Sequence, residues 1–313
     1  MNSNPDTPAL APRVHKFPDI DHFRSWAQNL QVECTPLVPR IAAQQTVLNL
    51  PGCGINYMKS FPRIVDAQLA AGCTAVMFSM DSGETIRVNG NDRDDDEMIV
   101  IAQGGARYHV VEPVERRHAT IVFSPQMMDR GWPETNRYCR VFPTSPSAVA
   151  WLRMLVTEIL AVSSTFDGAE AKQAAHAIKE SVLAGIDAAF ADMVAAPWLS
   201  RANSVQHVRL FQKIHDILAA GIGAPIYSTE LARQVGVSVR TVHDTVHRYT
   251  GLSLHRYLRL RRLWLVRQRL REGTHSVKAS ALAYGFWHLG DFARSYRAEF
   301  GETPSQTLAR AAM

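Results

Sequence analysis

The 313-residue sequence contains only four cysteines, and none of them lies close to another. They stand at positions 34, 53, 73 and 139, without a Cys-x-x-Cys pair or a neighbouring histidine cluster. This spacing encodes neither a zinc knuckle nor a disulfide framework, and it suits a reducing compartment. We therefore expect a cytoplasmic protein that carries no structural metal.

An export signal and long apolar runs are also missing. The first residues show no basic segment followed by an apolar one, and no uncharged apolar run approaches the roughly 20 residues needed to cross a bilayer. The apolar fraction of 46% and the charged fraction of 20% are near globular averages, which argues against long disorder. We expect a soluble, unexported protein without membrane contact.

Several patterns that carry enzyme chemistry are incomplete. Gly52 and Gly54 lack the third glycine and the following helix of a dinucleotide-binding loop. His243 and His247 have the spacing of a metal pair, but Asp-Thr-Val stands between them instead of the Glu-x-x of a zinc protease. The acidic run 92–97 lacks the features of a calcium loop and is expected to be a solvated loop between strands. We predict no enzyme, no cofactor and no metal.

Positive charge is concentrated in the last third of the chain. Residues 1–200 carry 17 Lys and Arg against 22 Asp and Glu, whereas residues 201–313 carry 17 against 7. Of those last 17 cations 15 are arginine, whose planar guanidinium suits phosphates and guanine edges. A polyanionic partner, nucleic acid in particular, is therefore favoured for this part of the chain.

The region from about residue 35 to residue 142 consists of short apolar runs broken by turns. Asn89-Gly90 is a tight hairpin signal, and Gly104-Gly105 marks another turn, so strands follow one another without intervening helices. This spacing predicts an antiparallel sandwich or barrel rather than a doubly wound sheet. The first dozen residues, which hold three prolines, are expected to trail in solvent. The predicted strands are 45–50, 74–80, 85–89, 98–102, 107–111 and 119–123.

Helical periodicity begins after Pro146, and a second, alanine-rich helix is predicted from Gly168 to about Met193. Small side chains along this second helix would let another helix approach closely, as a lid or a dimer seam. Pro197 and the polar stretch 200–204 are typical of a linker. The apolar positions of the first helix are Val149, Leu152, Leu155, Val156, Ile159 and Leu160. The small positions of the second are Ala174, Ala177, Val182, Ala188 and Ala189.

The C-terminal region repeats one pattern twice. In each copy a small residue, Ala232 or Ala281, precedes a turn glycine, and two apolar residues four apart follow. A small residue lets two helices cross closely, and glycine accepts the left-handed turn conformation. Each copy therefore predicts a helix-turn-helix unit whose second helix keeps one face free. The first copy comprises Ser228 and Ser238 as helix caps, Leu231, Val235, Gly236, Val242, Val246 and Gly251. The second comprises Gly285, Phe286, Phe292, Tyr296 and Gly301.

A continuous helix is predicted between the two copies, from residue 254 to residue 271. Leu263, Val266 and Leu270 are expected to face inward, and seven arginines are interleaved with them. At 1.5 Å per residue this helix would span about 27 Å, which is compatible with placing two recognition helices in successive major grooves about 34 Å apart.

Residues 205–307 resemble the DNA-binding domain of the AraC/XylS family of transcription regulators. The resemblance is most specific over Tyr284-Gly-Phe-Trp-His-Leu-Gly-Asp-Phe-Ala-Arg-Ser-Tyr296 and the following Phe300-Gly-Glu-Thr-Pro-Ser305. The motif Gly-Phe-Trp-His-x-Gly-x-Phe is similar to the one found in the subset that includes the ethanolamine-utilisation regulators. The resemblance implies promoter DNA and RNA polymerase as partners, with activation as the commoner outcome.

The family pattern also implies roles for individual residues. Arg240 and Arg294 would read base edges, each with about 1–3 kcal/mol of discrimination. Asp244 departs from the family, in which an arginine is common there, and a carboxylate would instead accept from a cytosine or orient Arg248. The other free-face positions are His243 and His247 on the first recognition helix and His288, Leu289, Gly290 and Asp291 on or beside the second. The predicted phosphate contacts are Ser238, Thr241, Arg248 and Arg297.

Relatives of this kind commonly carry a cupin-like β-sandwich ahead of the basic domain. The resemblance thus implies an α+β chain with a cupin-like effector-binding domain at 1–145 and a helical dimerisation segment at 146–196. A linker at 197–204 and an all-α double helix-turn-helix domain at 205–313 complete it. A small-molecule effector and a homodimer are implied partners. Two alternatives stay open: a constitutive DNA-binding protein with a non-sensing β-domain, and a cupin-type enzyme fused to a DNA-binding domain.

Overall fold

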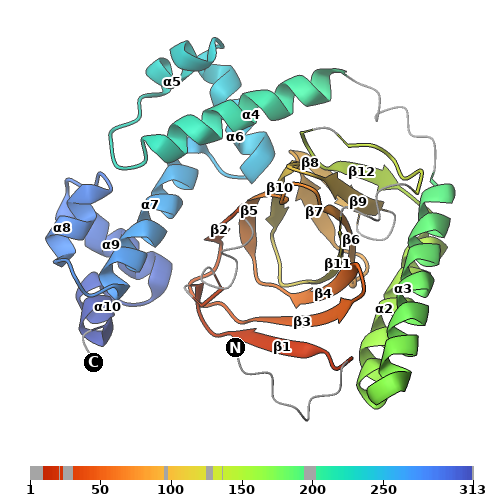
Figure 1. Cartoon of the computed structure of the whole chain (residues 1–313). Coiled ribbons are helices and arrows are strands. Elements are labelled where there is room, and N and C mark those ends of the chain that lie inside the picture. The colour runs from red at the N-terminus through yellow and green to blue at the C-terminus, as the bar shows by residue number, and fades with distance from the viewer. Residues whose placement is uncertain are drawn as a thin grey trace. The chain divides into compact units, whose positions relative to one another are not determined.

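The computed structural model describes residues 10–20, 22–23, 31–94, 98–124, 130–135, 137–193 and 202–311. The chain divides into two compact units. The first holds the β-strands together with helices α2 and α3, and the second holds helices α4 to α10 (Figure 1). The predicted succession of an antiparallel β-region and an all-helical region is confirmed.

The β-unit contains two sheets. A seven-stranded sheet has the order β1-β3-β4-β11-β6-β9-β12, and all of its neighbouring strands are antiparallel. A five-stranded sheet has the order β2-β5-β10-β7-β8, in which β10 is antiparallel to β5 and β7. The strands are β1 Arg13–Phe17, β2 Gln31–Pro36, β3 Ala43–Leu50, β4 Cys53–Lys59, β5 Arg63–Gln68, β6 Thr74–Ser79, β7 Thr85–Val88, β8 Asn91–Asp94, β9 Met98–Gln103, β10 Arg107–Glu112, β11 Arg117–Phe123 and β12 Arg140–Pro143.

One buried row of aliphatic side chains crosses five strands of the larger sheet. The strand register places Leu48 beside Ile55, Ile55 beside Ile121, Ile121 beside Val76, and Val76 beside Ile101. None of the five side chains is more than 1% exposed. Because side chains alternate between the faces of a strand, their neighbours in sequence point to the opposite face, toward the interior between the sheets. The row faces outward, where α2 and α3 contact β6 and β3.

The two helices of this unit, α2 (Pro146–Val162) and α3 (Gly168–Ala191), pack against each other and are joined through a 3-10 turn, η4 (Ser163–Thr165). Ser145 caps α2 by accepting a hydrogen bond from the Ala148 amide at 3.2 Å. Figure 1 shows both helices running along the larger sheet. The residue that lets α2 and α3 approach each other differs from those predicted. Ala177 and Ala188 are exposed, and the position that allows the helices to meet is Gly185, which lies against the Trp151 ring.

Gly185→Ala should therefore destabilise the protein. A Cβ at this position would lie 2.2 Å from the Trp151 ring, and relieving such overpacking costs typically about 1–3 kcal/mol. In a helix without the clash, the same substitution stabilises by roughly 0.5–1 kcal/mol. We expect Gly185→Ala to change sign when it is made in a Trp151→Ala background, measured by urea unfolding. A destabilisation that is equal in both backgrounds would contradict the contact.

The hydropathy of α2 also bears on the expected lack of membrane contact. Among the described residues one segment, Pro146–Thr165, is long and apolar enough to cross a membrane by length and composition, with a mean hydropathy of 1.3. Core helices of water-soluble proteins meet the same criteria. Val149, Leu152 and Val156 are each fully buried in the β-unit, so the segment is weak support for a membrane span.

Not every strand of the β-unit follows from the sequence, and one prediction for its loops was wrong. The strands β1, β2, β4, β5, β8 and β12 were not predicted. Asp92 lies in β8 and not in a loop, and its carboxylate accepts from Arg87 Nε of β7 at 2.6 Å. The predicted turn at Asn89-Gly90 is present, with φ of 48° and 75°. Both residues thus have the left-handed conformation that two-residue hairpin turns favour. Residues 95–97 of the acidic run and the first nine residues of the chain lie outside the described ranges.

The second unit is entirely helical. Its elements are α4 Ala202–Ala220, α5 Ser228–Val235, α6 Val239–Thr250, α7 Leu254–Arg271, α8 Val277–Ala283, α9 Leu289–Phe300 and α10 Pro304–Ala311. Helix α7 contacts α6, α8 and α10. As predicted, Leu263, Val266 and Leu270 are buried on it. Residues 194–201, where most of the predicted linker falls, lie outside the described ranges, and α4 already begins at Ala202.

Several arginines of α7 are engaged within this unit. Arg262 donates from Nε to the Ile222 carbonyl at 2.8 Å and from Nη2 to the Ala224 carbonyl at 2.7 Å. Arg267 pairs with Glu302 at 2.8 Å. Part of the basic charge counted in the sequence therefore stabilises the fold and does not face a partner.

Candidate nucleic-acid interface

The first helix-turn-helix unit is formed by α5 and α6. Gly236 ends α5 in the left-handed conformation, with φ of 75°. Ser238 begins the next helix, and its hydroxyl accepts from the Thr241 amide at 3.0 Å. Gly251 ends α6 with φ of 73°. The two glycines and the serine thus fix where the second helix of this unit starts and stops.

The two faces of α6 differ sharply in exposure. Val242 and Val246 are fully buried in the helical core. On the opposite face the Arg240 side chain is 91% exposed, and its Nε lies 3.6 Å from Asp244 Oδ2. His247 is exposed on the same helix. The free face that the sequence predicts for this helix therefore exists.

Two details of this unit differ from the predictions. Ser228 does not cap α5, since Tyr227 is the N-cap residue and makes no side-chain cap bond. Instead the Ser228 hydroxyl lies 3.1 Å from His243 Nε2, so that His243 is half-buried and engaged within the fold. Arg248 is likewise engaged, with Nη1 2.8 Å from Nδ1 of His207 on α4. A ligand would have to compete with these contacts.

The second helix-turn-helix unit is formed by α8 and α9 around the turn at Gly285, which has φ of 77°. An aromatic ladder holds α9 in place: ring centroids are 5.0 Å apart for Phe286 and Phe292, and 5.6 Å apart for Phe292 and Tyr296. The Tyr296 hydroxyl shares a hydrogen bond with Thr307 Oγ1 of α10 at 2.8 Å. The buried stripe predicted for α9 is confirmed, and α10 anchors its far end.

The exposed face of α9 brings most of the predicted contact residues together. The Arg294 side chain is 81% exposed and forms an ion pair with Asp291, one turn earlier. Sequence reasoning missed Trp287, which is 62% exposed at the start of this helix. A large aromatic residue directly after the apolar turn residue Phe286 was the available signal. The other predicted residues that are exposed here are His288, Leu289, Gly290 and Arg297.

The two candidate base-reading arginines share one electrostatic arrangement. Arg240 pairs with Asp244 and Arg294 pairs with Asp291, in both cases on the surface. Exposed ion pairs of this kind contribute only about 0–1 kcal/mol. Each guanidinium can therefore exchange its carboxylate for a phosphate or a guanine edge at little cost, while the pair orients it in the absence of a ligand.

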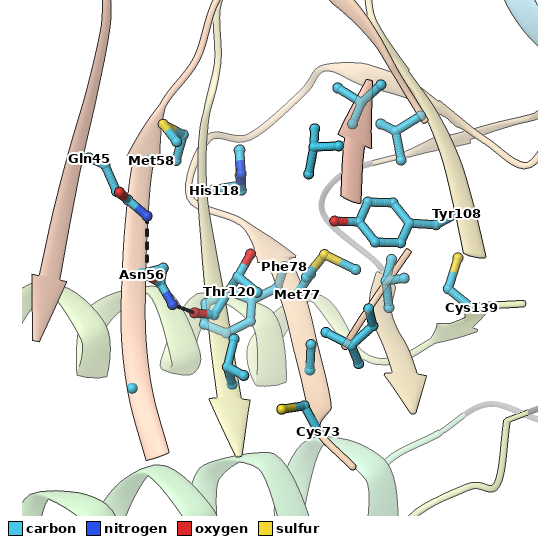
Figure 2. Close-up of a pocket in the computed structure, with 18 of the residues that line it drawn as sticks. Gln45, Asn56, Met58, Cys73, Met77, Phe78, Tyr108, His118, Thr120 and Cys139 are labelled. Atoms are coloured by element: carbon cyan, nitrogen blue, oxygen red, sulfur yellow. Dashed lines mark hydrogen bonds between the residues drawn. The ribbon is translucent and has the colours of Figure 1, made fainter. Parts of the chain in front are cut away.

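A second candidate site lies in the β-unit, where a cavity of about 650 Å³ opens between the sheets. Both sheets contribute to its wall, including Val47 and Asn56 of the larger sheet and Val65 and Tyr108 of the smaller one. Figure 2 shows the Tyr108 hydroxyl pointing into this space. A volume of this size is typical of small-molecule sites. The lining residues could not be predicted from the sequence, because inward and outward positions cannot be assigned without the strand register.

Two helix-turn-helix units, each with an arginine on the exposed face of its second helix, are the arrangement of a DNA-binding protein. Residues 231–310 match a family described as "Helix-turn-helix domain". The "XylDLEGF operon transcriptional activator 2" of Pseudomonas putida is 34% identical over 113 residues, which are 35% of this chain and 72% of that protein. The chain belongs to the AraC/XylS family of DNA-binding transcription regulators.

Other similarities cover the same region. The "HTH-type transcriptional activator RhaS" of Salmonella arizonae is 38% identical over 74 residues, which are 24% of this chain and 27% of that protein. A crystal structure of "a probable AraC family transcriptional regulator" from Rhodopseudomonas palustris is 34% identical, covers 33% of this chain and 97% of that one, and superposes with a TM-score of 0.31. For another XylDLEGF activator of P. putida the match spans 32% of its length.

Proposed function

We propose that this chain is a cytoplasmic transcription activator, which binds promoter DNA through α6 and α9 and responds to a small molecule held in its β-unit. The observation that carries the DNA-binding part is the pair of exposed arginines, Arg240 and Arg294, on helices whose opposite faces lie in the core. The relatives named as transcriptional activators support activation, with RNA polymerase as a further partner.

The proposed contacts divide by chemistry. Arg240 and Arg294 read base edges in successive major grooves, because bidentate contact of arginine to guanine is the commonest specific contact. Positions near the helix starts and on the flanks hold phosphates, which set the register without reading sequence. The proposed phosphate contacts are Ser238, Thr241, Arg248 and Arg297. The proposed flanking positions are His243, Asp244, His247, His288, Leu289, Gly290 and Asp291.

For the rest of the chain we propose the organisation that the family resemblance implies. Residues 1–145 form a cupin-like effector domain, 146–196 a dimerisation segment, 197–204 a linker and 205–313 the DNA-binding domain. The cavity between the two sheets supports an effector. Trp151 and Met154, which are exposed large apolar side chains on α2, support a homodimer contact. The proposed relationship to the ethanolamine-utilisation subset rests on the Gly-Phe-Trp-His motif alone.

The DNA-binding part is tested by selecting genomic fragments with the full-length protein over a salt series. We expect particular fragments to be enriched, and their affinity to fall by a factor of about 10³ or more between 50 and 200 mM salt if six or more phosphates are contacted. Binding without fragment preference at every salt concentration would contradict sequence-specific recognition.

A constitutive DNA-binding protein with a non-sensing β-unit is the second candidate. The cavity favours a sensing role, since a protein interior otherwise packs with few voids larger than a water molecule. Within the described ranges no group of three or more His, Cys, Asp or Glu side chains is placed to hold a metal ion. His109, a buried histidine of β10, lies 2.6 Å from Asp66 Oδ1 and is engaged within the smaller sheet.

A further inference from the structure

The wall of the β-unit cavity has a charged end and an uncharged end. Alternate residues of β10 line the cavity, in the order Tyr108, Val110 and Glu112. Glu112 belongs to the charged end, where its Oε2 lies 2.7 Å from Arg63 Nε. The backbone of Tyr108 is four residues away, which is about 13 Å along a strand. The two ends therefore offer different chemistry to a ligand.

The groups of the charged end interact with one another. The Glu112 carboxylate accepts from the Ser60 hydroxyl at 2.8 Å as well as from Arg63. Burial would raise the pKa of the Glu112 carboxyl, but Arg63, His118 and Arg116 together lower it to about 2. Since each of these groups acts on Glu112, the charged end is engaged within the protein. It does not require a charged ligand.

The Tyr108 ring is held at the uncharged end. It packs, together with Met77, against a buried apolar cluster that includes Ala75, Val100 and Cys139. Figure 2 shows its hydroxyl pointing away from this cluster into the open space. Among the described residues this hydroxyl has no hydrogen-bond partner. The Tyr108 hydroxyl is therefore a polar group that a ligand in the cavity can reach.

Two other polar atoms of the wall lack a hydrogen bond but are not open to the cavity. Gln45 Nε2 donates to Asn56 Oδ1 at 3.1 Å, whereas Gln45 Oε1 is buried without a partner among the described residues. His118 Nδ1 is also buried without a hydrogen bond, 3.7 Å from Glu112 Oε1. Because protein atoms cover both, a ligand could bond to either only after the wall rearranges.

The surroundings of Tyr108 disfavour charge. Burial is the main cause that raises the pKa of the Tyr108 hydroxyl to about 12, because a phenolate would lose its hydration there. The carboxylate or ammonium group of a ligand would lose its hydration at the same place. A neutral hydroxyl or carbonyl group escapes most of this cost when it gains a hydrogen bond.

We propose that the cavity binds a neutral, largely apolar molecule that carries a hydroxyl or carbonyl oxygen, and that this oxygen bonds to the Tyr108 hydroxyl. The inference rests on the proposed function and names the chemical class of its effector. A tyrosine hydroxyl can donate to either kind of oxygen. The apolar body contacts Met58, Met77 and Phe78, which Figure 2 shows around the same space. Methionine side chains adapt readily to the shape of such a body.

Other ligand classes match the cavity less well. A free sugar would leave most of its hydroxyl groups against aliphatic and sulfur-containing walls without partners. A hydrocarbon would fill the same space but leave the Tyr108 hydroxyl without a hydrogen bond, so it should bind more weakly than its hydroxylated counterpart.

The experiment compares matched probes on the full-length protein at pH 7. 4-tert-Butylphenol is the neutral probe, 4-tert-butylbenzoate and 4-tert-butylbenzylamine are its charged counterparts, and tert-butylbenzene lacks the oxygen. Octan-1-ol, octanoate and octylamine repeat the comparison on a flexible chain. Affinity is measured by isothermal titration calorimetry, with thermal stabilisation in parallel.

At least one neutral probe should bind about tenfold or more tightly than both of its charged counterparts. 4-tert-Butylphenol should also bind about threefold or more tightly than tert-butylbenzene, which is the range of one net hydrogen bond. Equal or tighter binding of the charged counterparts on both scaffolds, or no binding of either neutral probe, would overturn the proposal.

Two tyrosines provide a matched pair of variants. Tyr108→Phe removes only the hydroxyl, and should weaken 4-tert-butylphenol by about threefold or more while leaving tert-butylbenzene unchanged. Tyr57→Phe is the control, because its neighbours Asn56 and Met58 on β4 line the cavity and Tyr57 therefore points to the opposite face. It should leave both affinities unchanged. Equal effects of the two variants on 4-tert-butylphenol would overturn the role of Tyr108.

A third variant tests whether the probes occupy this cavity. Val110→Phe adds bulk to the wall two residues after Tyr108, and should weaken every probe, tert-butylbenzene included. Circular dichroism checks that the variant folds. If a folded Val110→Phe protein keeps all affinities, the probes bind elsewhere and the proposal is wrong.

Fragment selection on the same preparation separates this inference from the proposed function. Selective DNA binding by a protein that binds neither neutral probe would overturn the ligand class and leave the regulator. Binding of 4-tert-butylphenol that depends on Tyr108, together with DNA binding that lacks any fragment preference, would support the ligand site and overturn sequence-specific regulation.

Discussion

Arg294→Ala should lower the affinity of the protein for its selected DNA fragments while leaving its affinity for unselected DNA nearly unchanged. The Arg294 guanidinium is 81% exposed on α9, where it pairs with the exposed carboxylate of Asp291. A lost arginine-to-guanine contact costs about 1–3 kcal/mol, which is roughly a 5- to 150-fold loss of affinity. The measurement is a pair of binding isotherms, one on a selected and one on an unselected fragment.

Arg297→Ala is the matched control, because it removes the same group from the same helix three residues later. Arg297 is exposed and proposed to hold a phosphate. Its loss should weaken both fragments by a similar factor and reduce the slope of log affinity against log salt by about one. Equal weakening of both fragments by Arg294→Ala would show that Arg294 also contacts only the backbone.

Releasing Arg294 from its carboxylate gives an independent check. Asp291→Ala removes the ion-pair partner and leaves the guanidinium in place. Because exposed pairs contribute about 0–1 kcal/mol, this variant should keep fragment selectivity and bind as tightly as the parent or slightly more tightly. A loss as large as that of Arg294→Ala would mean that Asp291 itself contacts DNA or fixes the Arg294 rotamer.

The helix-turn-helix units could be predicted from the sequence because their determinants are local. Gly236 and Gly285 mark the turns, and Val242 with Val246 and Phe292 with Tyr296 mark the buried stripes at four-residue spacing. Within each copy these residues lie no more than 11 positions apart in the sequence. Helix periodicity and turn chemistry therefore determine the local structure without knowledge of distant contacts.

What the sequence did not reveal depends on contacts between distant positions. His243 is tied to Ser228, 15 residues away, and Gly185 lies against Trp151 of another helix. Short strands such as β5 and β8 carry no long alternating pattern of their own. They are defined by pairing with strands elsewhere in the chain, so periodicity alone does not identify them.

The cavity could not be predicted from the sequence for the same reason. Arg63, Glu112 and His118 come from three different strands, and whether each points inward depends on a register that shifts every side chain to the other face when it slips by one residue. Charge counting in the sequence likewise could not show that Arg63 and Glu112 form a buried ion pair inside this unit.

Glu112→Gln should be strongly destabilising. The Glu112 carboxylate accepts from Arg63 Nε and from the Ser60 hydroxyl inside the β-unit. Removing one member of a buried ion pair leaves the other charge uncompensated and costs about 3–5 kcal/mol. Glu115→Gln is the control, since it removes the same charge three residues later from an exposed pair with Lys59, where the loss should be at most about 1 kcal/mol. Urea unfolding followed by circular dichroism measures both.

The same group predicts how stability depends on pH. Burial, the largest single influence, would raise the pKa of the Glu112 carboxyl, but Arg63, His118 and Arg116 together outweigh it and the pKa falls to about 2. A carboxyl whose pKa is depressed in the folded state stabilises above its unfolded pKa, near 4.5, and that stability is lost as the pH falls from 4.5 toward 2. At about 1.4 kcal/mol per pKa unit, the loss amounts to roughly 3 kcal/mol.

Burial depresses the pKa of His118 from 6.5 to about 4. As the pH falls, this shift adds a second loss of stability, which begins at a higher pH than the loss due to Glu112. The unfolded state binds this proton first, so stability should begin to fall below pH 6.5, before Glu112 titrates. His118→Gln should therefore flatten the decline between pH 6.5 and 4 and keep the decline below 4.5. Glu112→Gln should do the reverse, apart from its loss of stability at every pH. If both variants keep the parent profile, Glu112 and His118 are not the groups that titrate on acid unfolding, and the carboxyls on the surface of the β-unit would carry the acid sensitivity.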